Sequence, residues 1–392
     1  MNYVYRFRLY PTKEQEQFLK QEAGNIRFVY NYFLSLAKKE YESTQKKWNY
    51  YEYKKLLPEL KKEFEFLKLS NSQSLQESLK NLDKAFKNFF KGLSDFPKFK
   101  KKKKVNSISI PQYFKIEGNK VKIPKLKTSI KFKKHRIIEG EIKSISIVIT
   151  PSGKYYLNIL TDREIKSLPK VRKAVAIDMG LTDFIVTSDN QAVKNPKHFK
   201  KLERRLKLWQ RRLSRKEKGS NNFKKWAKRV AKLHEKITNA KNDFLHKLSR
   251  KLIDENQVII VENLNIKGLI KNKKLSKHIH QASWYKFINM LEYKAKFYGR
   301  ELIKVDTFYP SSKLCSVCGY KNKELKLSDR TWICPVCKTK HNRDYNAALN
   351  LLKEGLKQVG LEQSGMGSPQ KSFCGDSSMP VEVALAGAVY TD

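Results

Sequence analysis

The chain has 392 residues and a formal net charge of +45, which comes from 83 Lys and Arg against 38 Asp and Glu. Its hydrophobic content of 40% is enough to build folded cores, which argues against disorder along the whole chain. A charge of this size opposes compaction unless a polyanion neutralises it, and nucleic acid is the expected partner. No apolar run approaches the roughly 20 residues that a membrane-spanning helix needs, so we expect no membrane partner.

The N-terminal segment predicts a strand followed by helices. Residues 1–10 alternate between large apolar side chains and mostly polar ones, which is the period of a half-buried strand. Thr12 has the residue type of a helix N-cap, and helical spacing continues to about Leu93. The segment lacks the continuous apolar core and the cleavage site of a signal peptide. We therefore expect a cytoplasmic, prokaryotic protein that acts at the nucleoid, in a reducing compartment where its cysteines form no disulfide framework.

A change in composition follows the helical segment. The lysine-rich run 98–104 predicts a loop. Residues 105–165 then alternate as antiparallel strands, with hairpin turns at Gly118-Asn119 and Ser152-Gly153. We expect the strand at 1–10 to join these strands in a small barrel.

The C-terminal half mixes buried strands with helices. A basic helical hairpin is predicted over 198–255, with one packed face that includes Trp209 and Trp226 and one cationic face. The tail 359–392 is rich in Gly and Ser, and we expect it to be disordered. The other predicted elements are strands at Ala174–Asp178, Phe184–Thr187, Val258–Val261 and Leu302–Val305, and helices near Trp284–Tyr298 and from about Tyr345 to Leu356.

Four cysteines have the spacing of a zinc site. Each Cys-x-x-Cys pair can wrap a tight turn that brings two thiolates to one ion, and two such pairs complete a closed tetrahedral site. Gly319 and Lys338 follow the two pairs, as such turns favour. With four protein ligands the zinc is structural, and we do not expect His341 to be a ligand. The four ligands are Cys315, Cys318, Cys334 and Cys337.

Three acidic residues are candidates for a second metal site. Asp178 and Glu262 each close an apolar strand, and Asp344 comes just before the last predicted helix. Each has an ordinary structural explanation by itself, as a turn residue before Gly180 or as a helix N-cap. Taken together, three carboxylates suit Mg²⁺ or Mn²⁺, and two such ions can hydrolyse a phosphodiester.

These motifs, in this order, resemble the TnpB family, the insertion-sequence-encoded relatives of the type V CRISPR nucleases. The resemblance runs nearly from end to end. In that family a RuvC-type, RNase H-like nuclease carries three acids, which fall here on Asp178, Glu262 and Asp344. The zinc ribbon precedes the third acid, as in the family. The matching segments are YRFRLYPT, FPKFKKKK, AIDMGLTDF, IIVENLNIKG, YPSSKLCSVCG and CPVCKTKHNRDYNAALNLL.

The resemblance implies an α+β multidomain protein. It combines an oligonucleotide-binding-type β-barrel, called the wedge, with a helical recognition domain, a RuvC-like α/β nuclease domain and an inserted zinc ribbon. The implied boundaries are 1–11 and 105–168 for the wedge, 12–104 for the recognition domain, 170–310 and 338–358 for the nuclease, and 311–337 for the ribbon.

The resemblance also implies an RNA-guided DNA endonuclease, monomeric around one guide RNA from the transposon end. It would cut double-stranded DNA beside a short transposon-adjacent motif, with base pairing reading the target. Asp178 would bridge two metal ions, Glu262 would hold one and Asp344 the other. Alternatives are a nuclease-inactive RNA-guided regulator, a transposase or accessory transposition protein, and a structural RNA-binding protein. Expected nucleic-acid contacts are Lys98, Lys100, Lys101, Lys102, Lys103, Lys104 and Arg343.

Overall fold

The computed structural model describes residues 1–102, 106–196, 198–271, 276, 279, 282–326 and 328–360, without the side chains of 198–201, 266, 267 and 270. The chain forms two compact units, one made of Met1–Glu164 with Leu206–Glu235 and the other of the remaining residues. Lys103, Lys104 and the tail from residue 361 onward lie outside the described residues. None of the helices in the described part has the length and apolarity to cross a membrane.

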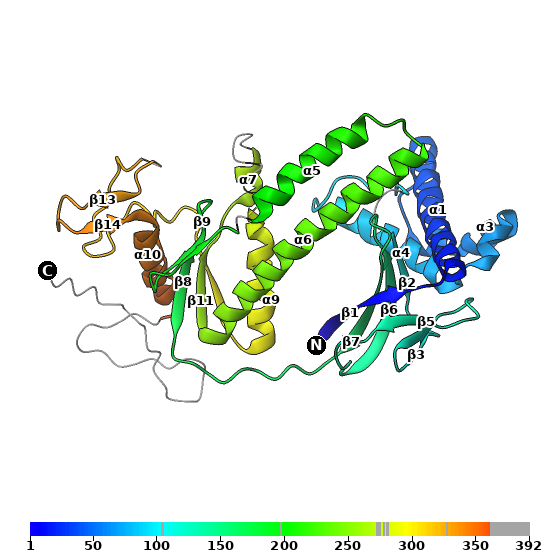
Figure 1. Cartoon of the computed structure of the whole chain (residues 1–392), viewed down its shortest axis with the longest axis horizontal. Helices are drawn as coiled ribbons and strands as arrows, with labels where there is room; N and C mark the ends of the chain where they lie inside the picture. The colour runs from blue at the N-terminus through cyan, green and yellow to red at the C-terminus, as the bar shows by residue number, and fades with distance from the viewer. Residues whose placement is uncertain are drawn as a thin grey trace. The chain divides into compact units, whose positions relative to one another are not determined.

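The first unit contains a curled antiparallel sheet of seven strands in the order β2-β6-β7-β1-β5-β4-β3 (Figure 1). β1 lies inside this sheet, paired with β7 on one side and β5 on the other, which confirms that the N-terminal strand joins the later ones. Gly118 and Gly153, in the two predicted turns, both have positive φ angles. The strands are β1 (Asn2–Tyr10), β2 (Asn106–Ile110), β3 (Lys115–Glu117), β4 (Lys120–Lys122), β5 (Ile130–Lys133), β6 (Glu141–Ile149) and β7 (Tyr155–Asp162).

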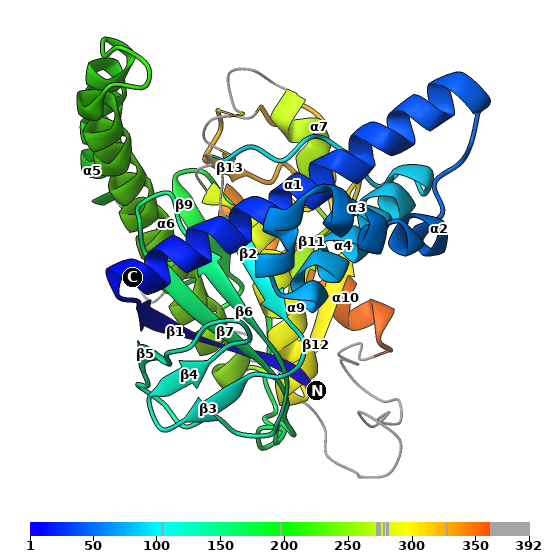
Figure 2. The same ribbon diagram turned by 90° about the vertical axis from the view of Figure 1, so that its right-hand side faces the viewer.

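Helices of the same unit pack on this sheet (Figure 2). Thr12 and Gln15 form a capping box at the start of α1, which confirms the predicted N-cap. Apolar residues of the helices and of the sheet belong to one continuous core, from Phe33 and Leu79 to Phe132 and Leu157. The elements are α1 (Lys13–Thr44), α2 (Tyr50–Lys55), α3 (Leu57–Glu63), the 3-10 helix η1 (Glu65–Leu69) and α4 (Ser72–Phe90).

The predicted helical hairpin is present as α5 (His198–Ser214) and α6 (Asn221–Glu255). The part of the hairpin from Leu206 to Glu235 belongs to the first unit. Trp209 and Trp226 are half-buried and contact each other across the hairpin, with ring centroids 6.2 Å apart. Glu235 binds this hairpin to the sheet, since its carboxylate accepts hydrogen bonds from Ser152 Oγ and, at 2.6 Å, from Tyr156 Oη.

The second unit is built on a five-stranded sheet in the order β10-β9-β8-β11-β12, in which β8, β11 and β12 are parallel. Alternate residues of β8 and β11 face two separate apolar cores, so both faces are covered. One core includes α6 and α9, the other α10. The elements are β8 (Ala174–Asp178), β9 (Asp183–Thr187), β10 (Ala192–Lys194), β11 (Val258–Glu262), α7 (Ile266–Lys271), α9 (Trp284–Tyr298), β12 (Glu301–Val305), β13 (Thr331–Ile333), β14 (Lys340–Asn342) and α10 (Arg343–Gln358).

Candidate functional site

Two of the three candidate acids end neighbouring parallel strands. Asp178 is the last residue of β8 and Glu262 the last of β11, and they directly follow the paired residues Ile177 and Val261. Because the carboxyl ends of parallel strands meet at one edge of a sheet, the two acids lie at the same edge. Side chains alternate along a strand, so Asp178 points to the same face as Ala176. That face, which Glu262 shares with Ile260, is the one covered by α10.

Asp344 lies in the first turn of α10, and here the expected helix start is wrong. The helix begins at Arg343 rather than at Tyr345, because Asn342 is its N-cap: Asn342 Oδ1 accepts hydrogen bonds from the backbone N–H groups of Asp344 and Tyr345 at 3.1 and 3.2 Å. Asp344 is therefore not needed as a cap. Its carboxylate, 29% exposed, is instead 3.4 Å from the guanidinium of Arg330.

Charge and burial act together on Asp178. Burial, with the neighbouring negative charges of Asp344 and Glu262, raises the pKa of Asp178 from 3.8 to about 7. Arg343 and Arg330 oppose this increase. Burial also raises the pKa of Glu262. An acid whose ionisation is opposed by two other acids is in the electrostatic setting that a divalent cation relieves.

The three carboxylates are nevertheless not tightly gathered. Among the described residues, the four cysteines are the one group of three or more acidic, His or Cys side chains whose ligand atoms all lie within 4.8 Å of one another. At least one pair of the three carboxylates is therefore farther apart than that. The donor set fits one or two hard cations by its chemistry, since carboxylate oxygens are the ligands that Mg²⁺ and Mn²⁺ prefer.

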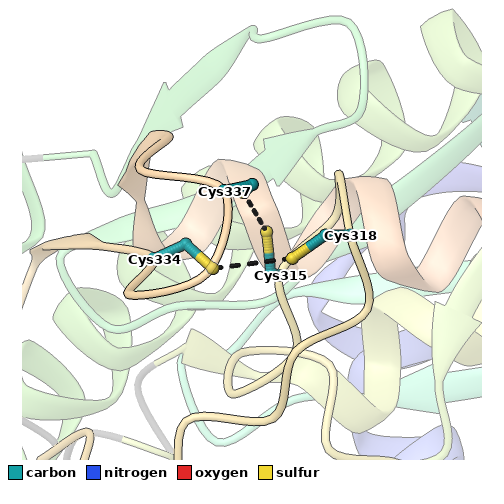
Figure 3. Close-up of side chains that lie close together, drawn as sticks. All are labelled: Cys315, Cys318, Cys334 and Cys337. Carbon is teal, nitrogen blue, oxygen red and sulfur yellow. Dashed lines mark hydrogen bonds between the residues drawn. The ribbon is translucent and has the colours of Figure 1, made fainter.

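The four cysteine side chains point toward one another (Figure 3). Cys315 Sγ lies 3.5 Å from Cys337 Sγ, and Cys318 Sγ lies 3.6 Å from Cys334 Sγ. A tetrahedral ion with Zn–S bonds of about 2.3 Å requires sulfur atoms roughly 3.8 Å apart, so the arrangement fits zinc. No disulfide is formed by these four residues.

Two turns of the same design hold the cysteines. In each pair the first cysteine donates its backbone N–H to the carbonyl five residues later, that of Tyr320 at 2.8 Å or of Thr339 at 2.9 Å. Gly319 and Lys338 take equivalent positions, both with a positive φ angle, as expected from the sequence. The two Cys-x-x-Cys segments are therefore two copies of one turn.

His341 contacts the cysteine cluster without belonging to the four-cysteine group. Its ring is buried against Trp332, and its Nε2 lies 3.1 Å from Cys315 Sγ. An N–H in that position would donate to the thiolate, which is the usual contact of a side chain that supports a metal ligand.

The basic residues expected to contact nucleic acid differ in their surroundings. Lys98 is ion-paired with Asp95 at 2.9 Å. Lys100 is anchored to α1, with its Nζ 3.8 Å from the ring centroid of Tyr30, and desolvation lowers its pKa to about 8. Lys101 and Lys102 are exposed. Arg343 donates to the carbonyl of Lys326 at 3.0 Å.

Sequence patterns gave no indication of Arg330. Arg330 is the residue just before β13, and no regular spacing in the sequence relates it to Asp344. Its guanidinium is 62% exposed beside the acid, so it can reach an anionic group at the same place. Arg343, the neighbour of Asp344 in the chain, donates instead to the carbonyl of Lys326, and Arg330 is the ion-pair partner of Asp344.

Three family models match the chain. Residues 158–273 match a family described as "Probable transposase", and residues 284–351 match one described as "Cas12f1-like, TNB domain". Residues 1–46 match a "Helix-turn-helix domain", although the structure forms one strand and one long helix there.

Individual relatives match over almost the whole length. A protein of Streptomyces pristinaespiralis named "Putative RNA-guided DNA endonuclease" is 36% identical over 98% of this chain and 97% of its own. "Putative RNA-guided DNA endonuclease InsQ" of Escherichia coli (strain K12) is 31% identical over 90% of this chain and 92% of its own. Among solved structures, that of the mini-RNA-guided endonuclease CRISPR-Cas_phi3 is 11% identical over 94% of each chain, with a TM-score of 0.44.

Proposed function

Because this chain belongs to the TnpB (OrfB) family of insertion-sequence proteins, we propose that it is an RNA-guided DNA endonuclease. It would bind a guide RNA from the transposon end and cut double-stranded DNA beside a short adjacent motif. The names of the two relatives matched over nine tenths of the chain support this activity. The net charge of +45 suits two polyanionic partners.

One observation carries the assignment of the site. Two acids end adjacent parallel strands on the face that α10 covers, and the third acid lies in the first turn of α10. We assign Asp178, Glu262 and Asp344 as the ligands of Mg²⁺ or Mn²⁺. The proposed domains are those implied by the resemblance: a wedge barrel at 1–11 and 105–168, a recognition domain at 12–104, a RuvC-like nuclease at 170–310 and 338–358, and a zinc ribbon at 311–337.

The roles of the residues follow from their surroundings. Divalent cations bound there would activate water and stabilise the charge that develops on the phosphodiester. Asp178, whose ionisation is opposed by burial and by two acids, would become fully ionised once the cations are present. The exposed guanidinium of Arg330 would contact a phosphate oxygen at the edge next to Asp344. The four cysteines would hold one structural zinc ion.

The test uses protein co-expressed with its own transposon end. The copurified RNA is sequenced, its guide end is reprogrammed, and the complex is incubated with a target library and Mg²⁺. Cuts should appear that depend on the guide and lie beside one short motif. Asp178→Ala should lower the cutting rate roughly 100-fold or more while leaving target binding intact, because a metal ion supplies several kcal/mol of transition-state stabilisation.

Asp189→Asn is the matched control. Asp189 is paired with Lys173 at 2.6 Å, in the turn after β9 and at the opposite end of the strands from Asp178. The Asp189→Asn variant should cut the target DNA at the rate of the parent. A discrete RNA with binding but no cutting by the parent would favour a regulator. The absence of any specific RNA would contradict RNA guidance.

A further inference from the structure

Helix α10 has two different buried faces. Leu351, Leu352 and Leu356 pack into the apolar core on the sheet. Asn346 and Asn350 are also buried, 1% and 4% exposed, although both carry amides. Because they are four residues apart they lie on one side of the helix. This polar face is directed at the backbone that leads into the first cysteine turn.

Asn346 holds both neighbours of Cys315. Its Oδ1 accepts a hydrogen bond from the backbone N–H of Ser316 at 2.9 Å, and its Nδ2 donates to the carbonyl of Leu314 at 2.6 Å. One amide thus pairs with a donor and an acceptor on either side of a cysteine. Because the amide of Asn346 is planar and makes both bonds, it fixes the orientation of the cysteine turn on the helix as well as the distance between them.

Further contacts extend this attachment along the helix. Asn350 Nδ2 donates to the carbonyls of Ser311 at 2.8 Å and of Leu314 at 2.7 Å. Lys353 Nζ donates to the carbonyl of Ser316. The segment Ser311–Ser316 is therefore bound to α10 over two turns of the helix.

The first buried residue of α10 is Asn346, two residues from Asp344. Ala347 and Ala348 are buried next to it, and the first residue of the helix in the apolar core on the sheet is Leu351, roughly 10 Å along the axis from Asp344. On the other side of Cys315, His341 contacts the sulfur and is followed by Asn342, the N-cap of the helix.

We propose that Asn346 is a positioning residue for Asp344. Its amide ties the first turn of α10 to the cysteine turn and so holds the Asp344 carboxylate at the edge where β8 and β11 end. The inference deepens the proposed function, because it takes Asp344 to be a ligand of the catalytic cation. The cysteine site and the acidic site then share one rigid element.

The experiment measures cation binding separately from cutting. Mn²⁺ binding to the full-length complex with its RNA is followed by the electron paramagnetic resonance of free Mn²⁺, for the parent, Asn346→Ala and Asp344→Ala. The binding lost in Asp344→Ala defines the acidic site. Asn346→Ala should weaken that site about 10- to 100-fold, as removal of residues that support metal ligands does, while one zinc ion per chain is retained.

Gln358→Ala is the matched control, since this exposed amide of the same helix donates to Glu354 at 3.3 Å, within one turn of its own helix. It should bind Mn²⁺ like the parent. The dependence of cutting on Mn²⁺ adds a second readout: Asn346→Ala should need more Mn²⁺ for half-maximal rate and recover most of the parent's rate at saturation. A variant that simply lost folded protein would instead show a lower rate at saturating Mn²⁺ as well.

The outcomes separate the two claims. Parent-like Mn²⁺ affinity in Asn346→Ala with zinc bound would overturn the positioning role while leaving the acidic site intact. Parent-like affinity in Asp344→Ala would instead overturn the acidic site, and the inference with it. If Asn346→Ala does not fold, Asn346→Asp is used, which keeps the acceptor for Ser316 N–H and loses the donor to Leu314. It should weaken Mn²⁺ binding, and parent-like binding would again count against the role.

Discussion

Gly355 of α10 lies against Ile260 of β11 so closely that a β-carbon on the glycine would come within 2.6 Å of the isoleucine side chain. This contact lets the helix lie directly on the strand that ends in Glu262. The φ angle of Gly355 is not positive, so its backbone conformation does not require glycine. Glycine is required because the helix and the strand approach each other so closely. The absence of a β-carbon at Gly355 therefore sets the distance between α10 and the sheet. That distance in turn sets the place of Asp344 relative to Glu262.

Gly355→Ala should therefore destabilise the protein by about 1–3 kcal/mol, the usual cost of overpacking a filled core. Urea unfolding with the change in tryptophan fluorescence measures this. Gly24→Ala is the control, because Gly24 is also in a helix but its β-carbon would meet only the Arg27 side chain, at 3.8 Å. Ala is the better helix former there, so that variant should be unchanged or slightly more stable. Equal effects at the two sites would contradict the packing argument.

The raised pKa of Asp178 predicts a pH-dependent stability of the metal-free protein. An acid whose pKa is raised on folding, here from 3.8 to about 7, binds its proton more tightly in the folded state. Its contribution to stability therefore falls as pH rises between those two values and stays low above them. Asp178→Asn cannot ionise, so in a chelator at pH 8 it should melt about 5 °C higher than the parent. The difference should shrink toward zero at pH 4, and a difference independent of pH would refute this.

The cysteine geometry predicts one zinc ion per chain. Cys318→Ser removes an exposed thiol with little effect on packing, and the bound zinc should fall to a small fraction of one ion per chain. Mass spectrometry of the metal content of the purified protein measures this. Cys374→Ser is the control, since Cys374 lies outside the spacing pattern, and it should keep the full content. Full zinc content in Cys318→Ser would show that three cysteines are sufficient.

Glu235 provides a test of how the helical hairpin is attached in the first unit. Glu235→Ala removes the acceptor of the half-buried Tyr156 hydroxyl and one of the partners of Ser152, which is 2% exposed and keeps Thr150 Oγ1 at 2.8 Å. Buried groups that lose a hydrogen-bond partner cost about 1–3 kcal/mol, which urea unfolding would detect. Glu217→Ala, in the exposed turn of the same hairpin, should change stability by less than about 0.5 kcal/mol. A Glu235→Ala variant as stable as the parent would show that these bonds are replaced by water.

Much of the architecture follows from periodicity. Period-two alternation predicts β1, β6 and β7, and helical spacing predicts α9 with its observed bounds, because each element buries one regular face. The same alternation is informative at the acids: Asp178 and Glu262 continue a face whose earlier residues are apolar, so a carboxylate at the strand end is out of pattern. That anomaly is what makes the two acids visible in the sequence.

Contacts between polar residues far apart in the sequence leave no such pattern. In the sequence, Asn346 and Asn350 look like an ordinary solvent-facing stripe of a helix, and only the structure shows that both are buried against the cysteine turn. Arg330 comes from a loop, where side-chain direction has no period, and its pairing with Asp344 depends on how β13 and β14 return the chain. The sequence predicts the start of α10 two residues too late because Asn342 and Asp344 are both good N-cap residues.

The position of β1 has a consequence for synthesis of the protein. This strand is made first, yet along most of its length its partner is β7, which ends at Asp162. The sheet cannot be completed until that residue has left the ribosome. The aromatic-rich β1 therefore stays unpaired with β7 while well over a hundred residues are translated, about 8–30 s at elongation rates of roughly 5–20 residues per second. During this time α1 and α4 can already collapse on each other, since their contacts are nearer in sequence. Nascent chains stalled before β7 should therefore be the ones that chaperones bind.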